Sequence, residues 1–131
     1  MTNMYYDNKG KVMALVIPAE HSVTGIEFFT RDEDPQQVAF MGHPAGHEIQ
    51  RHYHNPNPRT IDYTCETLVM RRGIMQVDLY ENREIIHSFR MKAGDIVTLF
   101  SGGHGFKMIE DTEMVEIKQG PYPGPADKTR F

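Results

Sequence analysis

The period of two in the hydrophobic pattern is the feature that most constrains the fold of this chain. In the run "IMQVDLY", Met75, Val77 and Leu79 alternate with more polar residues, as in a strand with one buried face. Similar short runs recur: "KVMALVI", "QQVAFM", "EIQRHYH", "ETLVMRR", "EIIHSFRM", "DIVTLF" and "EMVEIKQ". Turn-forming segments such as "KAGD" and "SGGHG" separate them. Many short strands with little helical period predict an all-β sandwich or barrel.

The length of 131 residues fits one domain, so we expect a single domain over residues 1–131. Two segments interrupt the strand pattern. "NPNPR", residues 55–59, carries two prolines and cannot continue a central strand. The tail "GPYPGPADKTRF", residues 120–131, is rich in Pro and Gly. We predict that it is extended, and that it either packs along the barrel or reaches a partner.

Composition excludes several classes of function. The net charge is −4 and no cluster of Lys or Arg stands out, so nucleic acid is not an expected partner. Cys65 is the single cysteine and cannot form an internal disulfide. The first residues are polar without the apolar core of a secretory signal, and no apolar run is long enough to cross a bilayer. We therefore expect a cytoplasmic location and no membrane partner.

Two histidines stand one residue apart in "GHEIQRHYHN". If "EIQRHYH" is a strand, Gln50, His52 and His54 lie on one face, where two imidazoles can reach a single ion. Exposed or structurally satisfied histidines are the alternative for such a pair.

A carboxylate on the next predicted strand strengthens the case for a metal. Glu66 shares its face with Leu68 and Met70, and an unpaired charge on an interior face would be costly. The same alternation turns Cys65 to the other face. His104 follows in the segment "SGGHGF", where we predict a glycine-flanked turn.

Taken together, these motifs resemble those of the cupin superfamily. The run Gly46–x5–His52–x–His54, followed by Glu66–x6–Gly73, resembles the first motif of that superfamily. The run Gly94–x5–Phe100–x–Gly102–x–His104 resembles the second. The resemblance covers a motif core at residues 46–104. It implies a jelly-roll β-barrel of the small single-domain cupin type, for which no reaction is assigned.

Carried onto this chain, the resemblance implies that His52, His54, Glu66 and His104 ligate one divalent metal. The spacing from His54 to Glu66 is longer than usual, Phe100 stands where proline is usual, and His104 lies one residue closer to the glycine. Water, His43 or His47 are alternatives to Glu66 or His104 as ligands.

Such a ligand set suits Fe, Mn, Ni, Co or Zn, and does not choose among them. The predicted substrate pocket includes Gln50, with Tyr63, Phe106 and Met108 as further candidates. Arg51 and Arg59 could meet an acidic substrate, although solvated surface positions are the more common case for arginine. Five methionines are predicted to fill the core: Met70, Met75, Met91, Met108 and Met114.

Three functions follow from these expectations. The first is a metal-dependent enzyme of dioxygenase, isomerase or lyase type that acts on a small polar substrate; the cupins it resembles often accompany carbohydrate genes. The second is a non-catalytic cupin that holds a metal or a small molecule. The third is acid–base chemistry by His52 or His104 without a metal. Because a strand such as "KVMALVI" suits edge-to-edge pairing, we also expect a homodimer.

Overall fold

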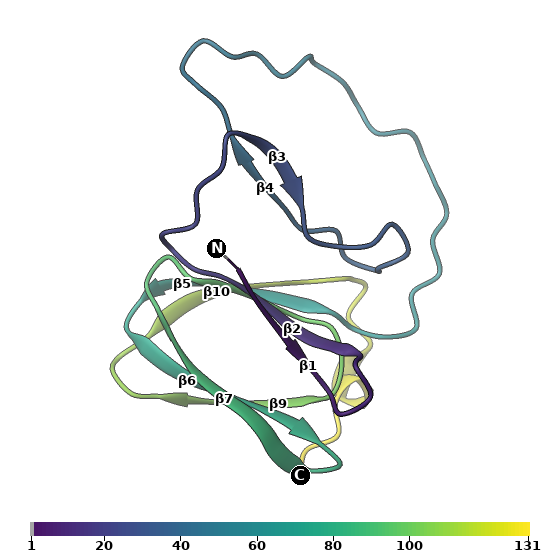
Figure 1. The fold of residues 1–131 in the computed structure, drawn as a ribbon. Coiled ribbons are helices and arrows are strands. Elements are labelled where there is room, and N and C mark those ends of the chain that lie inside the picture. Colours follow the sequence, from purple (N-terminus) through teal and green to yellow (C-terminus); the bar gives the residue numbers. More distant parts are fainter. Residues whose placement is uncertain (1) are drawn as a thin grey trace. The chain divides into compact units, whose positions relative to one another are not determined.

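The computed structural model describes residues 2–131 as an all-β chain whose paired strands are all antiparallel. No α-helix occurs in that range. The strands, labelled in Figure 1, are β1 (Asn3–Tyr6), β2 (Val12–Ile17), β3 (Gly25–Phe28), β4 (Ala39–Gly42), β5 (Glu66–Arg72), β6 (Ile74–Glu81), β7 (Glu84–Lys92), β8 (Ile96–Leu99), β9 (Gly103–Met108) and β10 (Glu113–Lys118). A 3-10 turn, η1, spans Gly124–Asp127. The prediction of an all-β chain is confirmed.

The chain forms two compact units. Unit 1 consists of the residues up to His21 together with Thr64–Phe131, and unit 2 is Ser22–Tyr63. Unit 2 contains the β3–β4 hairpin and a long irregular segment that follows it. A single domain over residues 1–131 stays a prediction.

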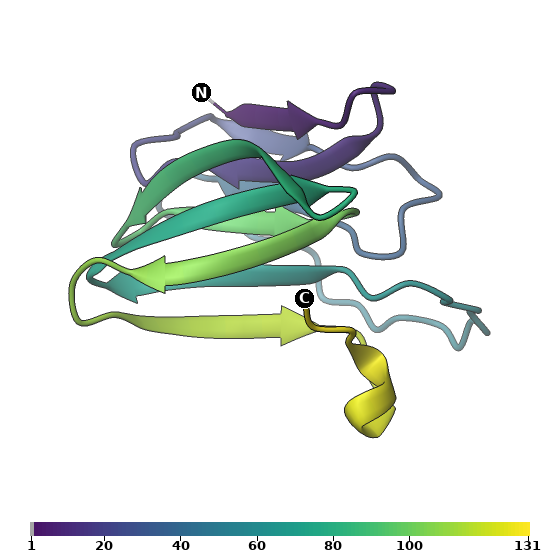
Figure 2. The ribbon, with the colours of Figure 1, turned by 90° about the horizontal axis from the view of Figure 1, so that it is seen from below.

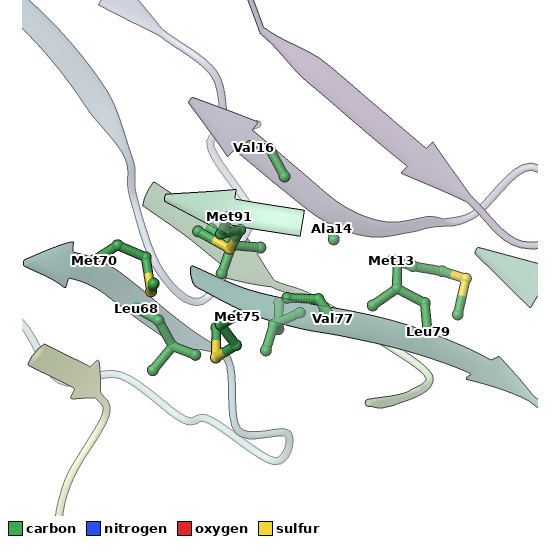
Figure 3. Close-up of a cluster of buried hydrophobic side chains, with 11 residues drawn as sticks. Met13, Ala14, Val16, Leu68, Met70, Met75, Val77, Leu79 and Met91 are labelled. Atoms are coloured by element: carbon green, nitrogen blue, oxygen red, sulfur yellow. The ribbon is translucent and has the colours of Figure 1, made fainter. Parts of the chain in front are cut away.

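Unit 1 is built from two sheets that enclose a common core. One sheet has the strand order β1-β2-β8-β5-β10 and the other has the order β7-β6-β9. The strands lie in these separate sheets and do not close into one ring. Side chains from both sheets form the buried cluster shown in Figure 3: Met13, Ala14, Val16, Leu68, Met70, Met75, Val77, Leu79, Met91, Val97 and Leu99. Burial of this apolar surface is the main force that holds the sheets together.

Methionine contributes much of the core, as the sequence predicts. Met70, Met75 and Met91 are buried, and Met114 packs against the same cluster. Met108 is different, because it is the last residue of β9 and is 44% exposed. Its assignment to the core is therefore wrong.

The alternating runs locate most strands of unit 1 correctly. Six runs of the sequence correspond to strands β2, β5, β6, β7, β8 and β10, and "QQVAFM" corresponds to β4 of unit 2. No alternating run of the sequence predicts β1, β3 or β9.

The predicted strand over residues 48–54 is wrong. These residues have no regular secondary structure, and their side chains are exposed. Ile49 and Tyr53 are 59% and 86% exposed, so the more apolar side of this stretch is not buried. Without burial of one face, alternation alone does not stabilise a strand.

His104 also differs from its predicted place. It is the second residue of β9 and pairs with Leu79 of β6, whereas the sequence predicts a glycine-flanked turn at this position. The turn lies just before it, at Gly102, whose φ of 76° is the left-handed conformation that glycine adopts readily.

The tail folds back onto unit 1. Instead of being extended throughout, it contains the turn η1, and its Phe131 ring packs edge-on against Tyr80 at 5.2 Å. Figure 2 shows this segment in yellow after β10. Within residues 2–131, no helix is long and apolar enough to cross a membrane.

Candidate functional site

Glu66 is a carboxylate on the inner face of unit 1. It begins β5, and alternation puts it on the same side as Leu68 and Met70, which belong to the core. Only 7% of the residue is exposed. Cys65, just before β5, is also buried, and its thiol lies 3.8 Å from the carbonyl oxygen of Phe100. The burial of Glu66 agrees with the interior face that the sequence predicts for it.

His104 is the partner of Glu66. Its Nε2 atom lies 2.8 Å from Oε1 of Glu66, and its side chain is 33% exposed. Because an ionised carboxylate only accepts hydrogen bonds, the imidazole donates this one. The pair joins β5 of the five-stranded sheet to β9 of the three-stranded sheet. Phe106, two residues along β9, packs against the core, so His104 also faces inward.

The hydrogen bond from His104 is the main reason why the pKa of Glu66 falls from 4.5 to about 2. Burial works in the opposite direction, because it disfavours the charged form. A hydrogen bond with Glu116 of β10 lowers the pKa of Glu66 further, and the same contact raises the pKa of Glu116. Glu66 is therefore an ionised acceptor at neutral pH.

Glu116 and Lys118, at the end of β10, both act on Glu66. Lys118 is directly opposite Glu66 in the β5–β10 register. Its ammonium is 3.7 Å from the carboxylate of Glu116 and 4.0 Å from that of Asp127. Sequence reasoning did not single out these three residues. The alternation of β10 places Glu116 and Lys118 on the same side as Met114, and this signal could have found those two residues. Asp127 belongs to η1, where no such pattern exists.

A hollow of about 220 Å³ lies beside these charges, between the start of β5, the end of β10 and the tail. Its lining residues are Thr64, Lys118, Gln119, Gly120, Tyr122, Pro123 and Asp127. The four residues predicted for a substrate pocket are not among them.

The other two predicted ligands belong to unit 2. His52 and His54 are exposed on the irregular segment, with ring centroids 5.4 Å apart at 73°. Nδ1 of His52 is 2.7 Å from the carbonyl oxygen of Gln50. The alternative ligands His43 and His47 form a second pair, whose nearly parallel rings stack at 4.0 Å.

The predicted pocket residues divide between the units in the same way. Gln50 and Tyr63 are exposed in unit 2, where Arg51 and Arg59 are exposed as well. In unit 1, Phe106 lies with its ring centroid 5.3 Å from that of His104. Met108, at the end of β9, is exposed.

The predicted metal ligands thus occur as one pair in each unit. Among residues 2–131, no group of three or more His, Cys, Asp or Glu side chains has an arrangement that could hold a metal ion. The Glu66–His104 pair offers one oxygen and one nitrogen donor, which is chemistry that a divalent transition metal accepts. Two donors are half of the predicted set.

The pair can also act on protons directly. A carboxylate that accepts a hydrogen bond from an imidazole fixes the orientation of the ring. Through Nδ1, the imidazole could then exchange a proton with a bound molecule.

Comparison with known proteins adds no assignment: no protein-family model, no curated protein and no solved structure matches this chain.

Proposed function

We propose that this chain is a small cupin-type protein that binds one divalent transition metal through a site that includes Glu66 and His104. The carboxylate–imidazole contact of 2.8 Å between strands of two facing sheets is the observation that carries the proposal. The all-β architecture supports the jelly-roll assignment, and the low pKa of Glu66 keeps the carboxylate in the ionised form that metal ligation requires.

His52 and His54 are further candidate ligands, and the motif resemblance alone supports them. With a metal of this class, the protein would act on a small polar substrate or hold it without turnover. Fe, Mn, Ni, Co and Zn all suit imidazole and carboxylate donors.

Metal analysis of protein purified without a histidine tag tests the proposal. We expect metal near one equivalent in the native chain, and its loss in Glu66→Gln/His104→Gln. His87→Gln serves as the matched control, because His87 contacts the carbonyl oxygen of Tyr6 and lies outside the pair. Loss of metal in His52→Ala/His54→Ala as well would extend the ligand set to four. No metal in the native chain after reconstitution with each of the five ions would overturn the proposal.

Metal-free acid–base chemistry by the same pair is a second candidate. The direct contact between Glu66 and His104 favours it, since the two groups already form a hydrogen-bonded carboxylate–imidazole dyad. If turnover of a substrate were found, a chelator would separate the two candidates: activity that survives complete metal removal belongs to the dyad.

A further inference from the structure

The hollow at the end of β10 has walls that hydrogen bonds hold in place. Its volume is about 220 Å³, and its lining comes from the start of β5, the end of β10 and the segment that contains η1, drawn in yellow in Figure 2. The backbone N–H of Cys65 donates to the side chain of Gln119 at 3.0 Å, and the hydroxyl of Thr64 donates to Asp127 at 2.9 Å. Because both bonds join the residues before β5 to the segment after β10, the hollow is formed without a ligand.

Two oppositely charged side chains in this hollow stand apart from each other. Nζ of Lys118 lies 4.0 Å from Oδ2 of Asp127 and 3.7 Å from Oε1 of Glu116. A direct hydrogen bond between an ammonium and a carboxylate measures about 2.7–2.9 Å, so neither contact is one. The side chains of Lys118 and Asp127 are nevertheless only 25% and 10% exposed. An oxygen atom about 2.8 Å from both Nζ and Oδ2 would bridge the gap between them.

The chemistry of the two groups selects what can bridge them. An ammonium only donates hydrogen bonds and an ionised carboxylate only accepts them, so the bridging oxygen must accept from Lys118 and donate to Asp127. A hydroxyl does both, whereas a ligand carboxylate has no proton to donate. A ligand hydroxyl also reproduces both hydrogen bonds of a water molecule at this position, which is the condition for displacing water without a loss of affinity.

The surrounding charges give no advantage to an anion. Lys118 lies near the carboxyl groups of Glu116 and Asp127, and it acts on Glu66 as well. Lys128 is a second cation near Glu116. Two ammonium groups therefore face three carboxyl groups, and no excess of positive charge attracts an anionic ligand to the hollow.

Tyr122 and Pro123 give the same hollow an apolar wall. Tyr122 is 72% exposed, and the ammonium of Lys118 lies over its ring, 5.9 Å from the centroid. A ligand with C–H groups on one face and hydroxyls at its edge would contact the ring and reach the ammonium at the same time. The volume of about 220 Å³ is below the roughly 300–1,000 Å³ of pockets for drug-sized ligands, so it suits one small ring.

We propose that this hollow binds a small, neutral, cyclic polyol of the size of one sugar ring. One of its hydroxyls accepts from Lys118 and donates to Asp127, and its C–H face packs on Tyr122. The site goes beyond the proposed metal centre and does not rest on it.

Titration of the full-length, metal-free chain with three methyl glycosides tests the proposal, with the backbone amide signals followed by NMR. The probes are the methyl α-pyranosides of glucose, galactose and mannose, which differ in the direction of single hydroxyls. We expect at least one of them to shift the amide signals of Gln119, Gly120 and Asp127 until saturation. The expected Kd is about 1 mM, the value that the ligand efficiency of drug-sized molecules gives for about 13 non-hydrogen atoms.

Two variants locate the binding in the hollow. Lys118→Met keeps the length of the side chain without the ammonium and should weaken binding about tenfold or more, the factor for losing a hydrogen bond to a charged group. Tyr122→Ala should weaken it about two- to tenfold, and this exposed position tests the site even if Lys118→Met does not fold. Tyr53→Ala is the matched control and should bind like the wild type, because Tyr53 is 86% exposed and belongs to unit 2.

Three results would overturn the proposal. The first is the absence of shifts around the hollow with all three glycosides at concentrations about twentyfold above the expected Kd. The second is a response of the same signals to sodium acetate or inorganic phosphate but not to the glycosides, which would show an anion site. The third is equal affinity in the wild type and both variants. Because metal is absent throughout, a failure of the proposed metal site would leave this result unchanged.

Discussion

Glu66→Gln in the metal-free protein should lower the free energy of unfolding at pH 7 by about 2–3 kcal/mol. The pKa of Glu66 falls from 4.5 to about 2 in the folded chain. A shift of that size corresponds to about 3 kcal/mol. Hydrogen bonds to charged groups typically contribute about 1.5–3 kcal/mol to stability, which agrees with the value from the pKa. The side chain is only 9% exposed, so solvent screens the interaction little.

The stability that Glu66 contributes changes with pH in a defined direction. A carboxylate with a depressed pKa stabilises the fold above its unfolded pKa of 4.5, and this stabilisation disappears as the pH falls towards 2. The free energy of unfolding of the wild type should therefore fall over that window. In Glu66→Gln it should fall less, because the variant has no carboxylate at this position to be protonated. Glu116 works in the opposite direction, because its raised pKa favours protonation on folding.

Urea unfolding at pH 7, 4.5 and 3, with a chelator present, measures the difference. Glu113→Gln is the matched control on the same pair of strands. Glu113 and Arg72 form an exposed ion pair at 3.3 Å, so its loss should cost less than about 1 kcal/mol. Equal stabilities of Glu66→Gln and the wild type at pH 7, with parallel pH profiles, would refute this account of the pair.

Substitutions at three further sites, Met75, Gly73 and Asp95, test the fold by urea unfolding. Met75→Ala should cost about 2–5 kcal/mol, because Met75 is fully buried in the core; a loss below about 1 kcal/mol would contradict that packing. Gly73→Ala should cost clearly more than Gly10→Ala, which pays only the left-handed penalty of about 1–2 kcal/mol. A Cβ at Gly73 would lie 2.2 Å from the carbonyl oxygen of Asp111, while Gly10 has open space; equal costs would argue against that contact. Asp95→Ala should cost at least about 2 kcal/mol, since the buried carboxylate accepts hydrogen bonds from two backbone N–H groups; Asp95→Asn, which keeps an acceptor, should cost less.

The sequence predicts the strands of unit 1 because their alternation reflects a buried face. In β6, Met75, Val77 and Leu79 are all completely buried, and the period of two is unbroken. The inward direction of Glu66 follows from the same pattern. The sequence does not predict β9, because Gly103 and Gly105 have no side chain. In "GHGFK" only three residues carry a side chain, which is too few to show alternation.

The histidine-rich stretch shows where the same reasoning fails. Gln50, His52 and His54 alternate with Ile49 and Tyr53, yet all five residues are exposed. Periodicity describes which side chains share a face, but only contacts with the rest of the chain decide whether that face is buried. The contact between Glu66 and His104 depends on pairing between strands that are distant in sequence, and no local pattern contains it.

The pairing of β2 with β8 has a consequence for the synthesis of this protein. The partner of Ala14 is Leu99, about 85 residues later in the chain. At about 5–20 residues per second, a ribosome needs roughly 4 to 17 seconds to translate that distance. Throughout this interval the apolar residues 13–17, all buried in the finished fold, have no β8 to pair with. The yield of folded protein in a cell therefore depends on what shields this nascent segment, such as a holdase chaperone, until β8 emerges from the exit tunnel.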